Sequence, residues 1–121
     1  MEKLTQQEEE AMQAVWKCNG GFIKDFLEGL PEPRPPYTTL ASTIKNLEKK
    51  GYLTGEKVGN TYRYAPRVAA EAYKQGQMST FVSDYFKNSY KELVAFFARE
   101  QRISADELKE IIDMIENKKS K

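Results

Sequence analysis

The spacing of apolar residues predicts three helices in the N-terminal part of the chain. The first opens with a capping box, Thr5-x-x-Glu8, in which each side chain satisfies a free backbone donor of the other residue. Residues 22–30 carry apolar side chains at helical spacing and predict a second, short helix. The proline-rich segment 31–36 is expected to be an extended connection, because proline lacks an amide donor and fixes φ. A third helix is expected over residues 39–50.

The third predicted helix has two contrasting faces. Leu40, Ile44 and Leu47 recur at spacings of four and three residues, so they lie on one side of a helix. The remaining side is polar and basic, and its side chains are mostly short. A helix that lies in a DNA groove needs such a surface. The outward residues are therefore candidates for contact with DNA.

A β-hairpin is predicted directly after this helix. Gly51 is a helix stop, and strands expected over 52–58 and 61–64 flank the dipeptide Gly59-Asn60. A two-residue hairpin loop of this kind requires positive φ, which glycine and asparagine tolerate. A recognition helix followed at once by a small hairpin is the second half of a winged helix-turn-helix. The wing is expected over residues 53–65.

The C-terminal part of the chain is predicted to be helical throughout. A long segment starts at residue 67, and Gly76 and Ser79 within it are expected to mark a bend. Two further helices are expected over 90–100 and 104–117, and the second of these opens with another capping box. The predicted fold class is mostly α with a small β-hairpin wing.

Two domains are expected: a winged helix-turn-helix over residues 1–72 and a helical dimerisation region over 73–121. About 45 residues in three helices cannot form an independent core of ordinary size, so the second region needs a further surface. A second copy of the chain is the expected partner, because most soluble oligomers are symmetric dimers. The alternative is a monomer whose aromatic residues pack back on the winged helix. The residues assigned to the homodimer interface are Phe81, Tyr85, Tyr90, Leu93, Val94, Phe97, Leu108, Ile111, Ile112 and Ile115.

The distribution of charge favours DNA as a partner. The 121-residue chain has a net charge of only +1, yet residues 34–74 hold eight basic residues against three acidic ones, a local excess of +5. This excess coincides with the proposed recognition helix and hairpin. Phosphate contacts supply much of the affinity of proteins for DNA, so a basic segment in a nearly neutral chain is informative. Charge alone is equally compatible with a solvated surface.

Composition argues against several other classes of protein. No run approaches the roughly 18 apolar residues of a membrane span, and the N-terminus is too acidic for a signal peptide, so a cytoplasmic protein without direct membrane binding is expected. Histidine is absent and Cys18 is the single cysteine, so we expect no disulfide, no metal site, no cofactor and no enzymatic activity. Cys18 is interpreted as a packing residue, with redox sensing as the alternative. Trp16 is expected in the core.

Three stretches resemble the penicillinase repressor family of the BlaI, MecI and CopY type. They are LTQQEEEAMQAVW near the N-terminus, YTTLASTIKNLEKKGYLTGEKVGNTYRYAP in the middle and KELVAFFAREQRISADELKEIIDMIEN near the C-terminus. The resemblance covers nearly the entire chain, in order. It implies a dimeric bacterial repressor whose winged domains bind a palindromic operator in double-stranded DNA. It also implies a membrane-bound sensor metallopeptidase upstream and cleavage of the repressor in its dimerisation region.

The resemblance assigns DNA contacts to a recognition helix over 38–50 and to the wing. Ser42 stands where the family usually has a threonine that faces the groove. Asn46 stands where the family commonly has arginine, and the preferred operator is expected to differ, because asparagine recognises adenine where arginine recognises guanine. The residues assigned to DNA are Thr38, Thr39, Ser42, Lys45, Asn46, Lys49, Lys50 and Arg63.

The segment that corresponds to the family's cleavage site differs from the family pattern. Resistance-associated members are cut at an Asn-Phe bond, and the segment LVAFFARE places Phe96-Phe97 at that position. Either the protease has a different preference here, or this repressor is controlled in another way. The paired Cys-x-Cys motifs of the copper-responsive branch are absent from the sequence.

A second function class remains open from the sequence. Some winged domains serve as docking platforms for proteins, so an interaction adaptor without specific DNA binding is the alternative to a repressor. A gel shift separates the two, because specific operator binding weakens steeply with salt.

Overall fold

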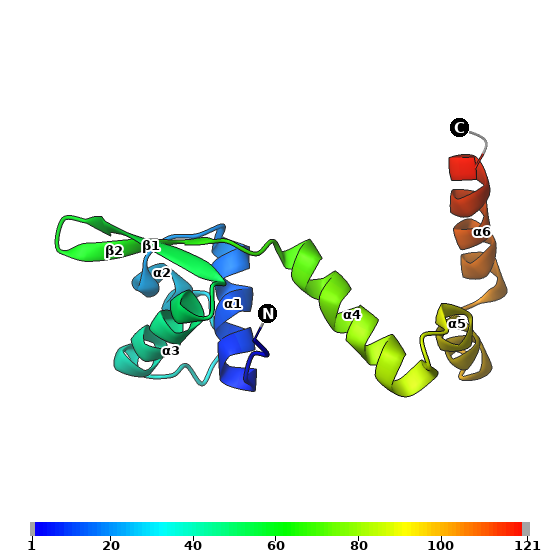
Figure 1. Ribbon diagram of the computed structural model, residues 1–121, viewed down its shortest axis with the longest axis horizontal. Coiled ribbons are helices and arrows are strands. Elements are labelled where there is room, and N and C mark those ends of the chain that lie inside the picture. Colours follow the sequence, from blue (N-terminus) through cyan, green and yellow to red (C-terminus); the bar gives the residue numbers. More distant parts are fainter. Residues whose placement is uncertain (1, 120–121) are drawn as a thin grey trace. The chain divides into compact units, whose positions relative to one another are not determined.

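The structure is a computed structural model that describes residues 2–119 (Figure 1). Its contacts divide the chain into two compact units between Lys74 and Gln75, which we call the first and second units. The elements in chain order are α1 (Gln6–Cys18), α2 (Ile23–Glu28), α3 (Tyr37–Lys49), β1 (Leu53–Val58), β2 (Thr61–Pro66), α4 (Ala70–Phe86), α5 (Tyr90–Arg99) and α6 (Ala105–Lys119). The described residues thus form helices and one two-stranded hairpin, which is the arrangement of a winged helix-turn-helix. The predicted fold class is confirmed.

Local sequence signals place both ends of α1. The Thr5 hydroxyl accepts a hydrogen bond from the Glu8 amide at 3.1 Å, and the Glu8 carboxylate accepts one from the Thr5 amide at 2.9 Å. This is the predicted capping box. At the other end Asn19 adopts a left-handed conformation with φ of 55°. The chain then turns through Gly20 and Gly21 toward α2.

The next two helices differ in extent from their predictions. The helix expected over 22–30 is shorter, because only Ile23–Glu28 is α-helical. The segment 31–36 is non-helical, as its prolines require. The third helix begins at Tyr37 rather than at residue 39, since Pro36 serves as its N-cap and accepts from the Thr39 and Leu40 amides at 3.1 Å.

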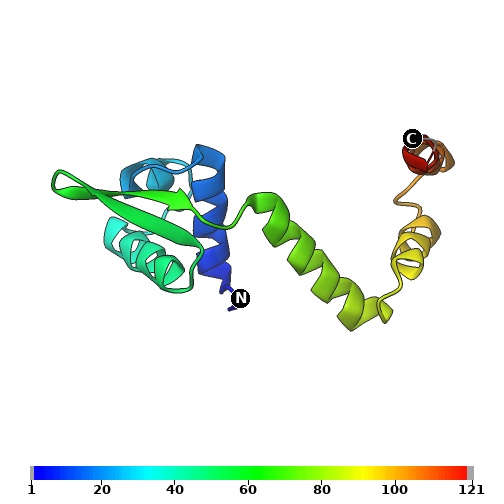
Figure 2. The same cartoon turned by 45° about the horizontal axis from the view of Figure 1, so that its top comes forward.

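β2 is longer than predicted, and it pairs with Gly21 as well as with β1. β1 and β2 are antiparallel, and Val58 lies opposite Thr61 across the Gly59-Asn60 loop. φ is +62° at Gly59 and is not positive at Asn60, the pattern of a turn with glycine first. Tyr64 exchanges two backbone hydrogen bonds with Gly21, at 2.7 and 2.8 Å. Figure 1 and Figure 2 show the hairpin tip extending beyond the helices of the first unit.

A single core holds the first unit together. α1, α2 and α3 enclose it, and the base of the hairpin closes it with Leu53 and Tyr64. Burying one aliphatic side chain of this kind stabilises the fold by about 1.5–3 kcal/mol. Trp16 packs against this core, as predicted. The buried core residues are Ala11, Met12, Ala14, Val15, Phe26, Leu30, Leu40, Ile44, Leu47, Tyr52, Leu53 and Tyr64.

The second unit holds most of α4 together with α5 and α6. α4 is unbroken from Ala70 to Phe86, so the bend predicted at Gly76 and Ser79 is wrong. A single interior glycine costs a helix only about 1 kcal/mol relative to alanine, which does not end it. α6 begins with the predicted capping box, in which Ser104 and Glu107 exchange hydrogen bonds of 2.9 and 3.1 Å.

Candidate nucleic-acid interface

The two faces of α3 differ as its sequence predicts. Leu40, Ile44 and Leu47 are buried in the core of the first unit. The outward-facing positions of α3 recur at the same spacings of three and four residues. Four of them hold polar residues that are exposed to solvent. Packing on one side therefore leaves a polar, cationic surface on the other. The exposed residues are Ser42, Lys45, Asn46 and Lys49.

The N-terminal turn of α3 adds hydroxyl groups beside a partial positive charge. Thr38 is exposed and Thr39 is half-buried. No side chain caps this end, because Pro36 occupies the N-cap. The first amides of a helix carry a partial positive charge that favours phosphate groups.

The wing presents cations on both of its faces. Arg63 is exposed on β2 and lies directly opposite Glu56 of β1, whereas Lys57 lies opposite Tyr62 on the other face. Successive residues of a strand point to opposite faces, so Arg63 points away from the side on which Tyr64 is buried. The glutamate opposite Arg63 offsets part of its charge.

A hydrogen bond links the wing to α3. Glu48 of α3 accepts from the Gly55 amide at 3.1 Å, and the ring of Tyr64 lies against Gly55. A Cβ at Gly55 would come within 2.9 Å of that ring and 3.0 Å of the Glu48 carboxylate. Glycine at this position therefore permits the close approach of the wing to α3.

An open hollow beside the start of α3 brings in residues that the sequence did not single out. Its volume is about 300 Å³, and its lining comes from α2, α3 and β2. Lys24 and Tyr37 are exposed there, next to Thr61 at the wing. No pattern within one element could have grouped these residues, because they come from three elements. The only sequence feature that could have drawn attention to any of them is the charge of Lys24 on α2, the helix before α3.

Lys50 lies apart from the predicted DNA surface. Its ammonium donates to Glu8 Oε1 at 2.6 Å and to the Lys3 carbonyl at 3.1 Å, and its side chain is only 19% exposed. Glu8 is buried, and its pKa is low: burial raises that pKa, but hydrogen bonds from Lys50 and Thr5 and the charge of Lys50 outweigh burial. The assignment of Lys50 to DNA is therefore revised to an internal ion pair.

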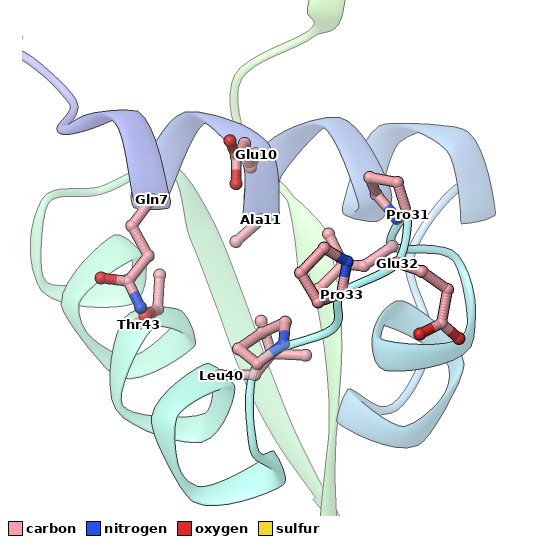
Figure 3. Close-up of a pocket in the computed structure, with 10 residues that line it drawn as sticks. Gln7, Glu10, Ala11, Pro31, Glu32, Pro33, Leu40 and Thr43 are labelled. Carbon is pink, nitrogen blue, oxygen red and sulfur yellow. The ribbon is translucent and has the colours of Figure 1, made fainter.

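A separate hollow of about 230 Å³ lies between α1, the 31–36 segment and α3. Figure 3 shows Gln7 and Ala11 of α1 facing Leu40 and Thr43 of α3, with prolines closing another side. The exposed cations of α3 do not line it.

Among residues 2–119 no cluster of metal-ligating side chains occurs. Over the same range no helix is long and apolar enough to cross a membrane.

Apolar side chains of the second unit are largely exposed. Val82 is its one fully buried apolar residue within the described range. Of the residues assigned to a dimer interface, Leu93 and Leu108 are half-buried. The assigned residues that are exposed are Phe81, Tyr85, Tyr90, Val94, Phe97, Ile111, Ile112 and Ile115. Met78, Phe96 and Met114, which were not assigned to the interface, are also exposed. Exposed apolar surface on this scale is unusual for a monomer.

Comparison with known proteins identifies the family. A family model described as penicillinase repressor matches residues 4–117. The penicillinase repressor of Bacillus licheniformis is 21% identical over 120 residues, which cover 98% of this chain and 94% of that protein. The methicillin resistance regulatory proteins MecI of Mammaliicoccus sciuri and of Staphylococcus aureus strain N315 are 22% and 21% identical over 117 residues, which cover 96% of this chain and 95% of each relative. The resemblance found in the sequence is thus confirmed, and the chain belongs to the penicillinase repressor family.

Proposed function

We propose that this protein is a dimeric transcriptional repressor that places α3 in the major groove of a palindromic operator. The observation that carries the proposal is the contrast on α3 between a buried apolar face and an exposed face with Ser42, Lys45 and Asn46. An α-helix fits the major groove, where such side chains reach the base edges. The family, which is described as penicillinase repressor, and the Bacillus licheniformis relative of the same name support this function.

Contacts with the sugar-phosphate backbone surround this helix. Thr38 and Thr39 lie at its N-terminal turn, where phosphate is favoured. Lys24 lies on one side of that turn and Arg63 on the wing, and Lys49 lies at the opposite end of α3. Backbone contacts position the protein, and we assign the discrimination of bases to Ser42, Lys45 and Asn46.

The salt dependence of operator binding tests this assignment. Lys49→Ala removes one phosphate contact from each protomer, so for the dimer the slope of log K against log salt should decrease in magnitude by about 1.8, which is about 0.9 for each contact. Lys109→Ala, an exposed lysine of α6, is the matched control and should leave the slope unchanged. Fluorescence anisotropy with labelled operator DNA measures both. Equal affinity of the wild type for operator and for scrambled duplex would overturn the proposal in favour of a protein-interaction adaptor.

The second unit supplies the dimer contact in this proposal. Among its apolar side chains at positions 75–117 only Val82 is completely buried, so a second copy provides the missing surface. Ile112→Asp places a charge in that surface and should give a monomer that binds a palindrome no better than a single half-site. Lys109→Asp introduces the same side chain at a polar position of α6 and should remain dimeric. Sedimentation velocity separates the outcomes, and a monomeric wild type would contradict the dimer.

Release of the repressor by proteolysis is the final element of the proposal. Phe96 and Phe97 are exposed on α5, and the bond between them corresponds to the family's cleavage site. A protease binds extended backbone, so α5 must open locally before it is cut. Intact-mass analysis of repressor recovered from cells with and without a β-lactam should show a fragment that ends at Phe96 in the treated sample only. An uncut chain in cells where repression has been relieved would exclude this route.

A further inference from the structure

Two aromatic residues hold the start of α4 against α1. The Trp16 indole donates to the Val68 carbonyl at 2.8 Å, and the Tyr73 hydroxyl donates to Glu9 Oε2 at 2.6 Å. The rings of Trp16 and Tyr73 lie 5.4 Å apart, centroid to centroid. We call these four residues the α4 clasp. All four belong to the first unit.

The clasp is made of interactions that resist rotation. A hydrogen bond to a carboxylate is directional and belongs to the stronger class of hydrogen bonds. Burial, together with the Glu9 carboxylate, raises the pKa of Tyr73 well above its usual value, so the hydroxyl remains a donor throughout the physiological range. Tyr52 packs edge-on against the Tyr73 ring at 6.0 Å and supports it from β1's side of the core.

Tyr73 is the last residue of α4 that packs on the core of the first unit. Val68 and Tyr73 both contact this core. The following stretch of the helix, residues 74–81, is exposed. The clasp therefore supplies the last contacts of α4 with the core of the first unit.

We propose that the clasp is a positioning device that sets which half-site separation a dimer accepts. This inference rests on the proposed function. α4 is the covalent route from the DNA-binding unit to the second unit, and it is one continuous helix. Half-site separation in dimeric DNA-binding proteins is a geometric property, since each added base pair turns a half-site by about 35° around the duplex. Fixing the start of α4 restricts the rotations that the two DNA-binding units can reach.

Operators with altered spacers test the clasp. Tyr73→Phe removes the hydroxyl and keeps the ring. Tyr52→Phe is a matched control, because it also removes one hydroxyl, which donates to the Glu2 carbonyl at 2.7 Å, from a ring outside α4. Wild type and Tyr52→Phe should lose on the order of tenfold in affinity when the spacer changes by one base pair, whereas Tyr73→Phe should lose only about threefold. Affinity for a single half-site should be equal in all three proteins.

A second variant tests the same hydrogen bond from its other partner. Glu9→Gln weakens the same hydrogen bond from its other partner, so it should broaden the spacing profile as Tyr73→Phe does, and the double variant should add little. An unchanged narrow profile in Tyr73→Phe would overturn the inference while leaving the proposed function intact. Failure of the wild type to bind any operator would instead overturn the proposed function.

Discussion

The Lys50 ammonium lies 2.6 Å from Glu8 Oε1, which ties the end of α3 to the start of α1. The same carboxylate oxygen accepts the Thr5 amide at 2.9 Å, so one buried group completes both a helix cap and a tertiary ion pair. The two side chains are 19% and 7% exposed. Lys50 at the end of α3 thus stabilises the fold, whereas its neighbour Lys49 is exposed to solvent.

Replacing Lys50 should lower the stability of the fold, whereas replacing its neighbour Lys49 should weaken DNA binding. Lys50→Met leaves Glu8 without its cation, so the free energy of unfolding should fall by about 1–3 kcal/mol. Lys49→Met should change it by less than about 0.5 kcal/mol. Urea denaturation measures both. In DNA binding the order reverses, because only Lys49→Met should reduce the salt slope; a reduced slope in Lys50→Met would restore Lys50 to the DNA surface.

Acid should weaken the fold through Glu8. Burial raises the pKa of Glu8, but the hydrogen bonds of Lys50 and Thr5 and the charge of Lys50 outweigh it, so the folded pKa lies below the usual value. A lowered folded pKa stabilises the protein above the unfolded value of about 4.3, and that contribution is lost as pH falls through the folded value. Glu8→Gln should be less stable at neutral pH and should lose less stability on acidification.

Thermal unfolding followed from neutral pH to below the unfolded value of about 4.3 measures this difference. Glu10→Gln, an exposed position on the same helix, is the control and should follow the wild type. Parallel pH profiles for Glu8→Gln and wild type would show that the ion pair does not control acid stability.

Asn46 should govern operator preference. Asn46→Arg exchanges a side chain suited to adenine for one suited to guanine, and a good bidentate contact is worth about 1–3 kcal/mol of discrimination. The favoured operator should therefore change at one symmetric pair of positions. Selection from a randomised duplex library measures this. An unchanged consensus in the variant would mean that Asn46 does not contact a base.

Gly55→Ala should loosen the wing. The added Cβ meets the buried Tyr64 ring at 2.9 Å, and overpacking of this kind costs about 1–3 kcal/mol. Gly76→Ala is the matched control, because nothing lies within 4 Å of a Cβ there and alanine is the better helix former. The melting temperature should fall for Gly55→Ala and not for Gly76→Ala. Equal melting temperatures would mean that the Tyr64 ring shifts freely.

Removing Glu56 should strengthen DNA binding. This carboxylate lies opposite Arg63 in the hairpin, so it offsets the charge of Arg63 and repels phosphate. Glu56→Gln should raise affinity a few-fold at low salt, with a smaller gain at high salt as screening increases. Anisotropy titrations at two salt concentrations measure the effect. A drop in affinity would show that Glu56 itself accepts a hydrogen bond from DNA.

Local patterns predicted the elements of the fold well. Capping boxes formed as expected at Thr5 and Ser104, and the glycine of the hairpin loop has the expected positive φ. Each of these features depends on residues within one turn. The spacing of Leu40 and Ile44 correctly separated the faces of α3. Gly76 shows where local signals were too weak, since the hydrogen bonds of the surrounding helix outweigh the preference of one residue.

By itself the sequence determined the helical and hairpin elements, the outward residues of α3 and the family. Only the tertiary structure decided that Lys50 pairs with Glu8, 42 positions away, and that Tyr73 binds Glu9, 64 positions away. It also brought Lys24 to Tyr37 and the wing. The physical reason is that helix and turn preferences act between near neighbours, whereas the partner of a long polar side chain depends on how whole elements pack.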